Sequence, residues 1–397
     1  MRFFISLFLS LALGLTSCSQ TLAPISQRRG GVLRSESDGS GTSAGTDPVS
    51  SGDESGDSEE VPSAIYVCGV EYPDTDSSQI VVLRDTTLML ALLPDIPKGI
   101  GLDPDTHFLY SDKLYTTASY GDKTIVALGG QPVFSFEGRE YISDIIPTSR
   151  GLWTLGNDRS GEGFALRLDG KTVFKSGSGK GSCLHIDGGK TYCLYSSDDN
   201  QNPCLVEEGI YRDLSPRFGT RVLDARVVEG ELWLLEQAED AWIVSTSQER
   251  FDYPPRPPFQ FRGARLYVRP DCRCSAVISL QAPGMGVPVE LICTDGEEML
   301  TGGGGGSCYH YFEGSQPYLL RYDRLRSHLS IGTAATEYAC LDSTLISNRR
   351  AAQAWGSHFY AACYPAAGGE AILWSDGTVK GLGFDGYPTG VSVSPPK

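Results

Sequence analysis

The chain has 397 residues, with 33 lysines and arginines against 49 aspartates and glutamates, and a formal net charge of −16. Residues 63–397 carry −12 once the −5 of residues 19–62 and the +1 of Arg2 are set aside. This negative charge repels phosphates and no basic stripe is present, so the composition argues against nucleic acid as a partner.

The N-terminus has the features of a secretion signal. Arg2 precedes an apolar run of thirteen residues, Phe3 to Leu15, which suits a signal-peptide core and is short for a membrane span. The next residues, Leu15-Thr16-Ser17-Cys18, resemble a bacterial lipobox. The resemblance implies that residues 1–17 are removed and that Cys18 becomes the lipid-anchored N-terminus. The expected location is the cell envelope, at the outer membrane; the alternative is an ordinary secretory signal with an incidental cysteine.

Residues 18–62 are expected to be the lipidated cysteine and a disordered tether. The segment is dominated by Ser, Gly, Asp and Glu and has almost nothing to bury. A flexible chain of this length spans roughly 35–40 Å. Within it, Gly41 to Gly45 reads GTSAG, which matches a hydrolase nucleophile pattern. No strand precedes the motif and no apolar helix follows it, so we expect no catalysis there.

Residues 63–397 alternate short apolar strands with Gly, Asp and Pro turns, which predicts an all-β domain. Eight strand starts recur between Tyr66 and Tyr360 with a mean period of 42 residues. Each clear copy suggests four strands, and the Asp-Gly pairs, as in "LWSDGTV", predict tight hairpins. The pattern predicts a single β-propeller of eight four-stranded blades. Seven blades with an extra hairpin, or two β-sandwiches in tandem, remain alternatives.

The ends of the domain predict how the ring closes. The first copy, "AIYVCGVE", lacks a preceding strand, and the chain ends on a spare alternating strand, "GYPTGVSVS". We predict that this C-terminal strand completes the first blade. The pairing of "IYVCGVE" or "FYAACYP" with "LWSDGTVKGL" resembles the "YVAGYE…WKNGK" repeats of Bacteroidota-type outer-membrane lipoproteins. That resemblance implies a propeller in the envelope and carries no established reaction.

Ten cysteines remain besides Cys18, and an exported protein can form disulfides. Cys183 and Cys193 flank a turn symmetrically about Gly188, and Cys274 could pair with Cys293 across another hairpin. Pairing of Cys193 with Cys204 competes with the first choice. Cys68 and Cys363 are equally well read as reduced core residues. We expect no metal site, because the Cys272-Arg273-Cys274 spacing is not that of a zinc motif, and no cofactor.

No catalytic constellation is visible along the sequence, which leaves enzyme activity open and favours a non-enzymatic role. The five histidines are scattered, and the Gly-rich stretch near Lys180 lacks the residues of a phosphate-binding loop. Loops that should emerge on one face of the ring are acidic. Their candidate binding residues are Asp74, Asp76, Asp158, Asp198, Asp199, Glu239 and Asp240. The plainer interpretation is that Asp suits turns and keeps the protein soluble.

Three functions are compatible with this sequence. The first is a membrane-anchored propeller that binds a glycan, peptide or protein partner without catalysis. The second is a glycan-processing enzyme with paired carboxylates at the central channel. The third is a structural subunit of an outer-membrane assembly. Exposed Trp or Tyr on the loop face would favour the first, and a broad apolar patch on the flank would favour the third.

Overall fold

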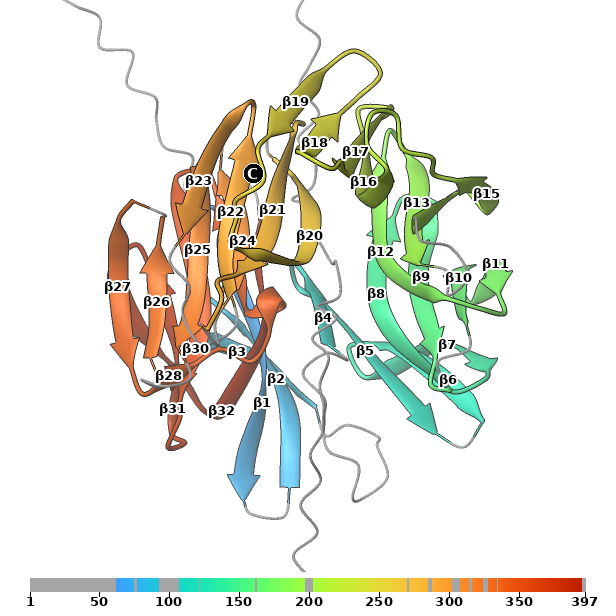
Figure 1. Ribbon diagram of the computed structural model, residues 1–397. Helices are drawn as coiled ribbons and strands as arrows, with labels where there is room; N and C mark the ends of the chain where they lie inside the picture. The colour runs from blue at the N-terminus through green and yellow to red at the C-terminus, as the bar shows by residue number, and fades with distance from the viewer. Residues whose placement is uncertain are drawn as a thin grey trace, which may run out of the picture.

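A computed structural model gives the architecture of the folded part (Figure 1). The structure describes the following residues: 62–74, 77–92, 107–120, 122–160, 163–196, 203–269, 271–284, 288–301, 308–313, 316–323, 328–333 and 335–394. Cys18, which was predicted to carry the lipid, and the predicted tether therefore lie outside the described residues, as do Asp76, Asp198 and Asp199.

Six antiparallel sheets of four strands follow one another along the chain. The first holds β4 (His107–Tyr110), β5 (Lys113–Tyr120), β6 (Lys123–Leu128) and β7 (Gln131–Glu137). The second holds β8 (Glu140–Thr148), β9 (Gly151–Asp158), β10 (Phe164–Leu168) and β11 (Lys171–Ser176). The third holds β12 (Lys180–Asp187), β13 (Lys190–Ser196), β14 (Pro203–Glu207) and β15 (Ile210–Asp213).

The fourth sheet holds β16 (Arg221–Val228), β17 (Glu231–Gln237), β18 (Trp242–Ser245) and β19 (Arg250–Tyr253). The fifth holds β20 (Gln260–Val268), β21 (Cys274–Gln281), β22 (Pro288–Thr294) and β23 (Glu297–Thr301). The sixth holds β24 (Cys308–Glu313), β25 (Gln316–Asp323), β26 (His328–Gly332) and β27 (Glu337–Asp342).

The seventh sheet has eight strands and joins the two ends of the domain. From the N-terminal side it takes β1 (Ala64–Asp74), β2 (Ser77–Arg84) and β3 (Thr87–Leu92). From the C-terminal side it takes β28 (Thr344–Leu345), β29 (Ala352–Trp355), β30 (His358–Pro365), β31 (Glu370–Ser375) and β32 (Thr378–Ser394). A single turn of 3₁₀ helix, η2 (Arg349–Ala351), precedes β29. No helix of the described part is long and apolar enough to cross a membrane.

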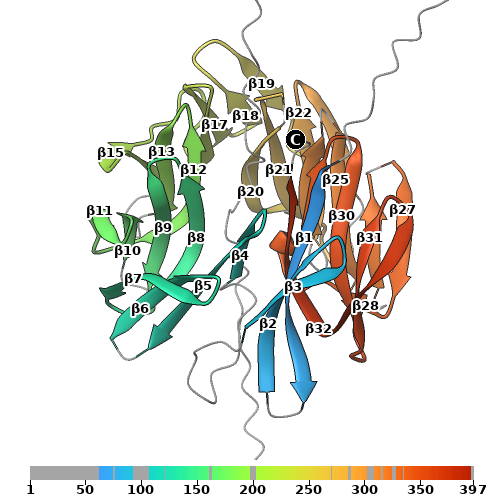
Figure 2. The ribbon, with the colours of Figure 1, turned by 180° about the vertical axis from the view of Figure 1, so that it is seen from behind.

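The long strand β32 closes the ring. Its first part pairs with β31 as far as Asp385, and its second part pairs with β1 from Gly386 to Ser394. The predicted completion of the first blade by the C-terminal strand is therefore confirmed. Because β32 belongs to two sets of four strands, the ring has seven sheets but eight four-strand units. Figures 1 and 2 show these sheets arranged around a common centre, which is the predicted all-β propeller and not two sandwiches.

The first strand of each unit is the inner one. First strands of neighbouring units contact each other, as β8 does with β12 and β16 with β20. The fourth strand is the outer one, and all four side chains of β15 are exposed. Apolar side chains of the middle strands alternate between the two neighbouring units. On β13, Tyr192 and Leu194 pack toward the fourth sheet, while Cys193 and Tyr195 pack toward the second.

Three of the Asp-Gly pairs form outer hairpins, as predicted, at residues 169–170, 295–296 and 376–377. Asp169 and Gly170 have φ values of 48° and 76°, and Asp376 and Gly377 have 46° and 84°. Positive φ at both central residues is the geometry of a two-residue turn whose twist matches that of the flanking strands. The repeated turn therefore joins the third and fourth strands of each unit in which it occurs, β10 to β11 and β31 to β32.

Candidate functional site

The acidic loop residues that the structure describes lie where the second strand of a unit meets the third. Asp74 ends β1, Asp158 ends β9, and Glu239 and Asp240 connect β17 to β18. Equivalent connections of a propeller emerge on the same face of the ring, which we call the loop face. Asp158, Glu239 and Asp240 are exposed.

Asp158 has a local structural role in its turn. Its carboxylate accepts hydrogen bonds from the backbone N–H and the hydroxyl of Ser160, at 2.8 and 2.7 Å. These two bonds hold the pKa of the Asp158 carboxyl below its usual value. At this position the structure favours the plainer interpretation, in which the acid stabilises a turn.

Three tyrosines lie on the same face and were not singled out in the sequence. Tyr72 is 48% exposed and lies two residues before the end of β1. Its ring is 5.7 Å from that of Tyr387, which is 6.0 Å from the ring of Tyr364. Tyr387 begins the inner strand beside the end of β1, and Tyr364 is at the equivalent end of β30. We call Tyr72, Tyr387 and Tyr364 the tyrosine row.

Most of the buried acids that the structure describes are held by cations or backbone amides. Glu140 binds both terminal guanidinium nitrogens of Arg167, at 2.5 and 2.6 Å. Asp224 accepts from Arg226 at 2.8 Å and from the Leu266 N–H at 2.7 Å. These pairs are structural in character, because each charge is neutralised inside a sheet or between neighbouring sheets.

The buried carboxylate of Glu236 is also held by hydrogen bonds, but its main donors are backbone N–H groups. One of its oxygens accepts hydrogen bonds from three consecutive N–H groups, those of residues 217–219, at 2.7 to 3.0 Å. Its other oxygen accepts from the Ser245 hydroxyl at 3.0 Å. The carboxylate is fully buried and anchors the loop that leads into β16.

Arg350 of η2 reaches across the inside of the ring. Its guanidinium donates to the carbonyl oxygen of Ser143 in β8 at 3.0 Å and lies 4.0 Å from the centre of the Phe108 ring in β4. It thereby links the C-terminal strands to the first and second four-stranded sheets. Burial and the charge of Arg350 together lower the pKa of His107 to about 4. His107 is therefore neutral near neutral pH, as a structural histidine would be.

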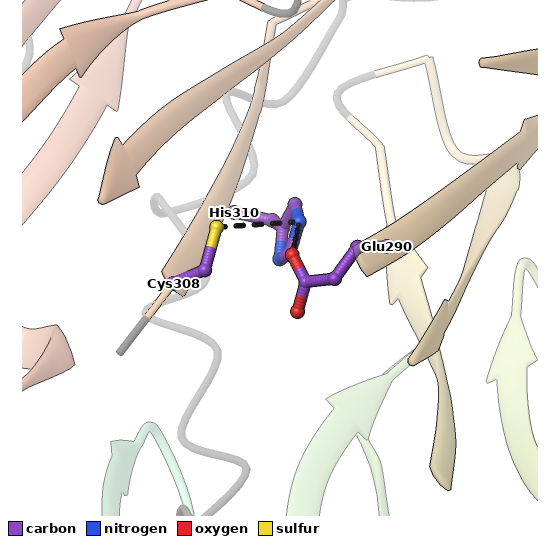
Figure 3. Close-up of side chains that lie close together, drawn as sticks. All are labelled: Glu290, Cys308 and His310. Atoms are coloured by element: carbon purple, nitrogen blue, oxygen red, sulfur yellow. Dashed lines mark hydrogen bonds and ion pairs between the residues drawn. The ribbon is translucent and has the colours of Figure 1, made fainter. Parts of the chain in front are cut away.

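Glu290, Cys308 and His310 converge between the fifth and sixth sheets (Figure 3). Oε2 of Glu290 is 2.9 Å from Nε2 of His310, and Sγ of Cys308 is 3.9 Å from the same nitrogen. Burial and the Glu290 carboxylate raise the pKa of Cys308 well above its usual value. Burial alone would raise the pKa of Glu290, but the ring of His310 lowers it overall.

A second group of possible metal ligands lies on the surface of the sixth sheet. His328 on β26 and Cys340 and Asp342 on β27 bring their ligand atoms within 4.8 Å of one another. Cys340 and Asp342 are exposed, and all three residues belong to one hairpin. Neither group was predicted, because the sequence spacing matches no zinc motif and the partners come from different strands.

An open cleft of about 730 Å³ lies between the third and fourth sheets. Tyr192, Leu205 and Leu234 line its apolar part. Its charged groups largely satisfy each other, since Glu207 pairs with both Lys190 and Arg212.

None of the ten described cysteines forms a disulfide bond, so the predicted pairs are not formed. Cys183 lies opposite Leu194 and Cys193 opposite Leu184, because the turn is centred between Gly188 and Gly189 and not on Gly188. The shift of one position puts the two sulfurs on opposite faces of the sheet.

The other two predicted or competing cysteine pairs fail in register as well. Cys293 lies opposite Ala276, which makes Cys274 only a diagonal neighbour, and Cys204 lies opposite Tyr195 and not Cys193. Cys68 and Cys363 are fully buried core residues, and burial raises their pKa to about 11 and about 12.

No protein-family model matches the chain, and no curated protein matches its sequence. A crystal structure of Citrobacter koseri AztD is similar over 84% of this chain and 98% of that chain, with 7% identity and a TM-score of 0.51. Dihydro-heme d1 dehydrogenase NirN in complex with DHE is similar over 84% of this chain and 76% of that chain, with 10% identity and a TM-score of 0.51. These likenesses show the β-propeller fold and nothing finer.

Proposed function

We propose that the protein is a lipid-anchored propeller of the bacterial envelope that binds a partner without catalysing a reaction. The observation that carries the binding role is the tyrosine row on the loop face. Tyrosines offer large, rigid, amphipathic surfaces and are enriched where proteins bind partners. The exposed Tyr72, with the partly buried Tyr387 and Tyr364 next to it, suits a partner with flat apolar surfaces, such as a glycan or a peptide.

The state of the buried carboxylates supports binding over glycan hydrolysis. A glycosidase needs two carboxyl groups about 5–10 Å apart and available to the substrate. Glu140, Asp224 and Glu236 are instead neutralised by arginines or by backbone amides. The likeness to NirN does not decide the question, because a fold shared at 10% identity says nothing of activity.

The flank of the ring supports binding over a purely structural role. Exposed apolar side chains of the outer strands are spread around the ring, from one sheet to the next. They are Leu88, Met89, Val133, Val173, Ile210, Tyr211, Leu300, Tyr338 and Val379. Single exposed apolar residues on successive sheets are ordinary, whereas a packing surface in an assembly would gather them in one patch.

The anchor itself is proposed from the lipobox resemblance at Leu15 to Cys18. A tether of forty-four residues would follow it and separate the propeller from the membrane. A diacyl modification provides two chains, which suffices for stable attachment. The outer membrane is the proposed location. Protease accessibility in intact cells would show which face of this membrane carries the propeller.

Two substitutions, Cys18→Ser and Tyr72→Ala, test the two parts of this proposal, and Cys340→Ser is the control for the first. Cys18→Ser should abolish incorporation of a labelled fatty acid and change fractionation, while Cys340→Ser should leave both unchanged. Tyr72→Ala should weaken retention on immobilised envelope glycans or peptides at least about tenfold, because interface tyrosines often carry over 1 kcal/mol. Equal labelling of Cys18→Ser and wild type would remove the anchor from the proposal. Turnover of a glycan by the wild-type protein would contradict the proposed non-catalytic role and favour the glycan-processing enzyme.

A further inference from the structure

The residues Glu290, Cys308 and His310 are brought together by the ring and by nothing in the local sequence. Cys308 and His310 are two residues apart on β24, so both side chains point to the same side of that strand. That side faces the fifth sheet, where β22 presents Glu290. Three side chains of metal-ligand type thus meet at the interface between two sheets.

The separations of the ligand atoms suit a single small cation. All three atoms lie within 4.8 Å of one another. Zinc bonds of about 2.0–2.3 Å in a tetrahedron place sulfur about 3.5 Å from nitrogen and oxygen about 3.4 Å from nitrogen. The observed separations are 3.9 Å for sulfur to nitrogen and 2.9 Å for oxygen to nitrogen. Shifts of about half an ångström in the ligand atoms would therefore place them at three corners of the tetrahedron.

The donor set selects the kind of metal. A thiolate, an imidazole and a carboxylate together favour a borderline cation such as Zn²⁺ over Ca²⁺ or Mg²⁺, which take oxygen ligands. The thiolate and the carboxylate would supply two negative charges to the metal. Arg321, which lies opposite Cys308 on β25, carries no lone pair for coordination and is not a ligand.

The orientation of the imidazole agrees with this assignment. Nε2 is the nitrogen directed at both Glu290 and Cys308. The ring is only 2% exposed, and Nδ1 has no hydrogen-bond partner among the described residues. Nε2 is therefore the ring nitrogen that faces both other donor atoms, at the position where the metal would lie.

We infer that Glu290, Cys308 and His310 form a binding site for a zinc-like divalent cation with three protein ligands and one open position. This inference departs from the expectation of no metal drawn from the sequence. It does not rest on the proposed function, because the site lies between two sheets and involves neither the lipid anchor nor the tyrosine row. A three-ligand site leaves the fourth position to water or to a group from another molecule.

Cobalt and zinc titrations of the purified, reduced full-length protein test the inference. One equivalent of Co²⁺ should give the charge-transfer absorption of a cobalt–thiolate bond, and equimolar Zn²⁺ should abolish it. Cys308→Ser should remove the absorption and weaken zinc binding at least about tenfold. Glu290→Gln should weaken zinc binding to a similar degree while keeping the size of the side chain.

Cys340→Ser is the matched control, since Cys340 belongs to the second ligand group on the same sheet. It should leave both the absorption and the zinc affinity unchanged. Circular dichroism of each metal-free variant establishes whether it is folded. If Cys308→Ser does not fold, the zinc affinity of Glu290→Gln tests the assignment instead. Absence of the thiolate absorption in the wild type, its persistence in Cys308→Ser, or its loss in Cys340→Ser would each overturn the assignment.

Discussion

Arg167 and Glu140 show how single residues stabilise this ring from within. Both side chains are almost fully buried, and the guanidinium also lies 3.8 Å from the centre of the Phe136 ring in the preceding sheet. The pair therefore neutralises two charges inside the second sheet and connects it to the first. Ion pairs of this kind add little by forming, but the loss of one partner leaves a buried charge.

We expect Arg167→Met to lower the free energy of unfolding by about 3–5 kcal/mol, because Glu140 would remain buried without its cation. Urea denaturation followed by tryptophan fluorescence measures the change. Lys190→Met is the matched control, since Lys190 pairs with Glu207 at the surface and its loss should have little effect. Similar stabilities for the two variants would contradict a role for the buried pair.

His185 predicts a dependence of stability on pH. Burial and the charge of Arg226 lower its pKa to about 3, and its Nε2 accepts the Val227 N–H at 3.2 Å. The unfolded chain keeps the ordinary value of about 6.5, so it binds the proton first as the pH falls. The stabilising contribution is present above pH 6.5 and is lost progressively toward pH 3.

Denaturation at pH 7, 6 and 5 checks this expectation. The wild type should lose up to about 1.4 kcal/mol per pH unit from His185 in the lower part of this range. His185→Gln keeps an acceptor for Val227 and removes the titrating ring, so its stability should decline less steeply. Parallel curves for the two proteins would show that His185 does not sense the pH.

At the scale of elements, β32 is the strand on which the ring depends. It serves as the outer strand of the last unit and as the inner strand of the first. The change occurs at Gly386, whose φ is 158° and where an added Cβ would lie 1.9 Å from the carbonyl oxygen of Val70. Only glycine allows the two backbones to approach so closely.

We therefore expect Gly386→Ala to destabilise the protein by more than about 2 kcal/mol, because the strand would have to move away from β1. Gly383→Ala is the control, since Gly383 has a φ of 73° with open space around its Cα. It should cost only about 1 kcal/mol from backbone strain. Chemical denaturation distinguishes the two, and equal losses would show that the contact with Val70 is unimportant.

At the scale of the whole molecule, neighbouring units are joined by polar contacts that repeat with the period of the sequence. Asp187 accepts from the N–H of Glu229, His185 from that of Val227, and Asp224 from that of Leu266, each pair being 42 residues apart. The spacing of these partners equals the mean period of 42 residues, so the hydrogen bonds join equivalent positions of adjacent units. These polar contacts join neighbouring sheets alongside the apolar clusters that lie between them.

The sequence by itself determined the class of fold, the four-strand unit and the closure by the C-terminal strand. These follow from local signals, namely the alternation of apolar residues along a strand and the Asp-Gly turns between strands. The resemblance of Leu15 to Cys18 to a lipobox is local as well, and it stays a prediction because Cys18 lies outside the described residues. The count of units stayed open between eight and seven, because the copies near residues 277 and 309 are irregularly spaced.

Only the tertiary structure decided which side chains meet. A shift of one position in the register placed Cys183 and Cys193 on opposite faces, and no count of residues around the turn could reveal it. Glu290 meets Cys308 and His310 across two sheets, and Tyr72 meets Tyr387 across the closure of the ring. Such contacts depend on how sheets are stacked around the centre, which is a property of the closed ring and not of any segment.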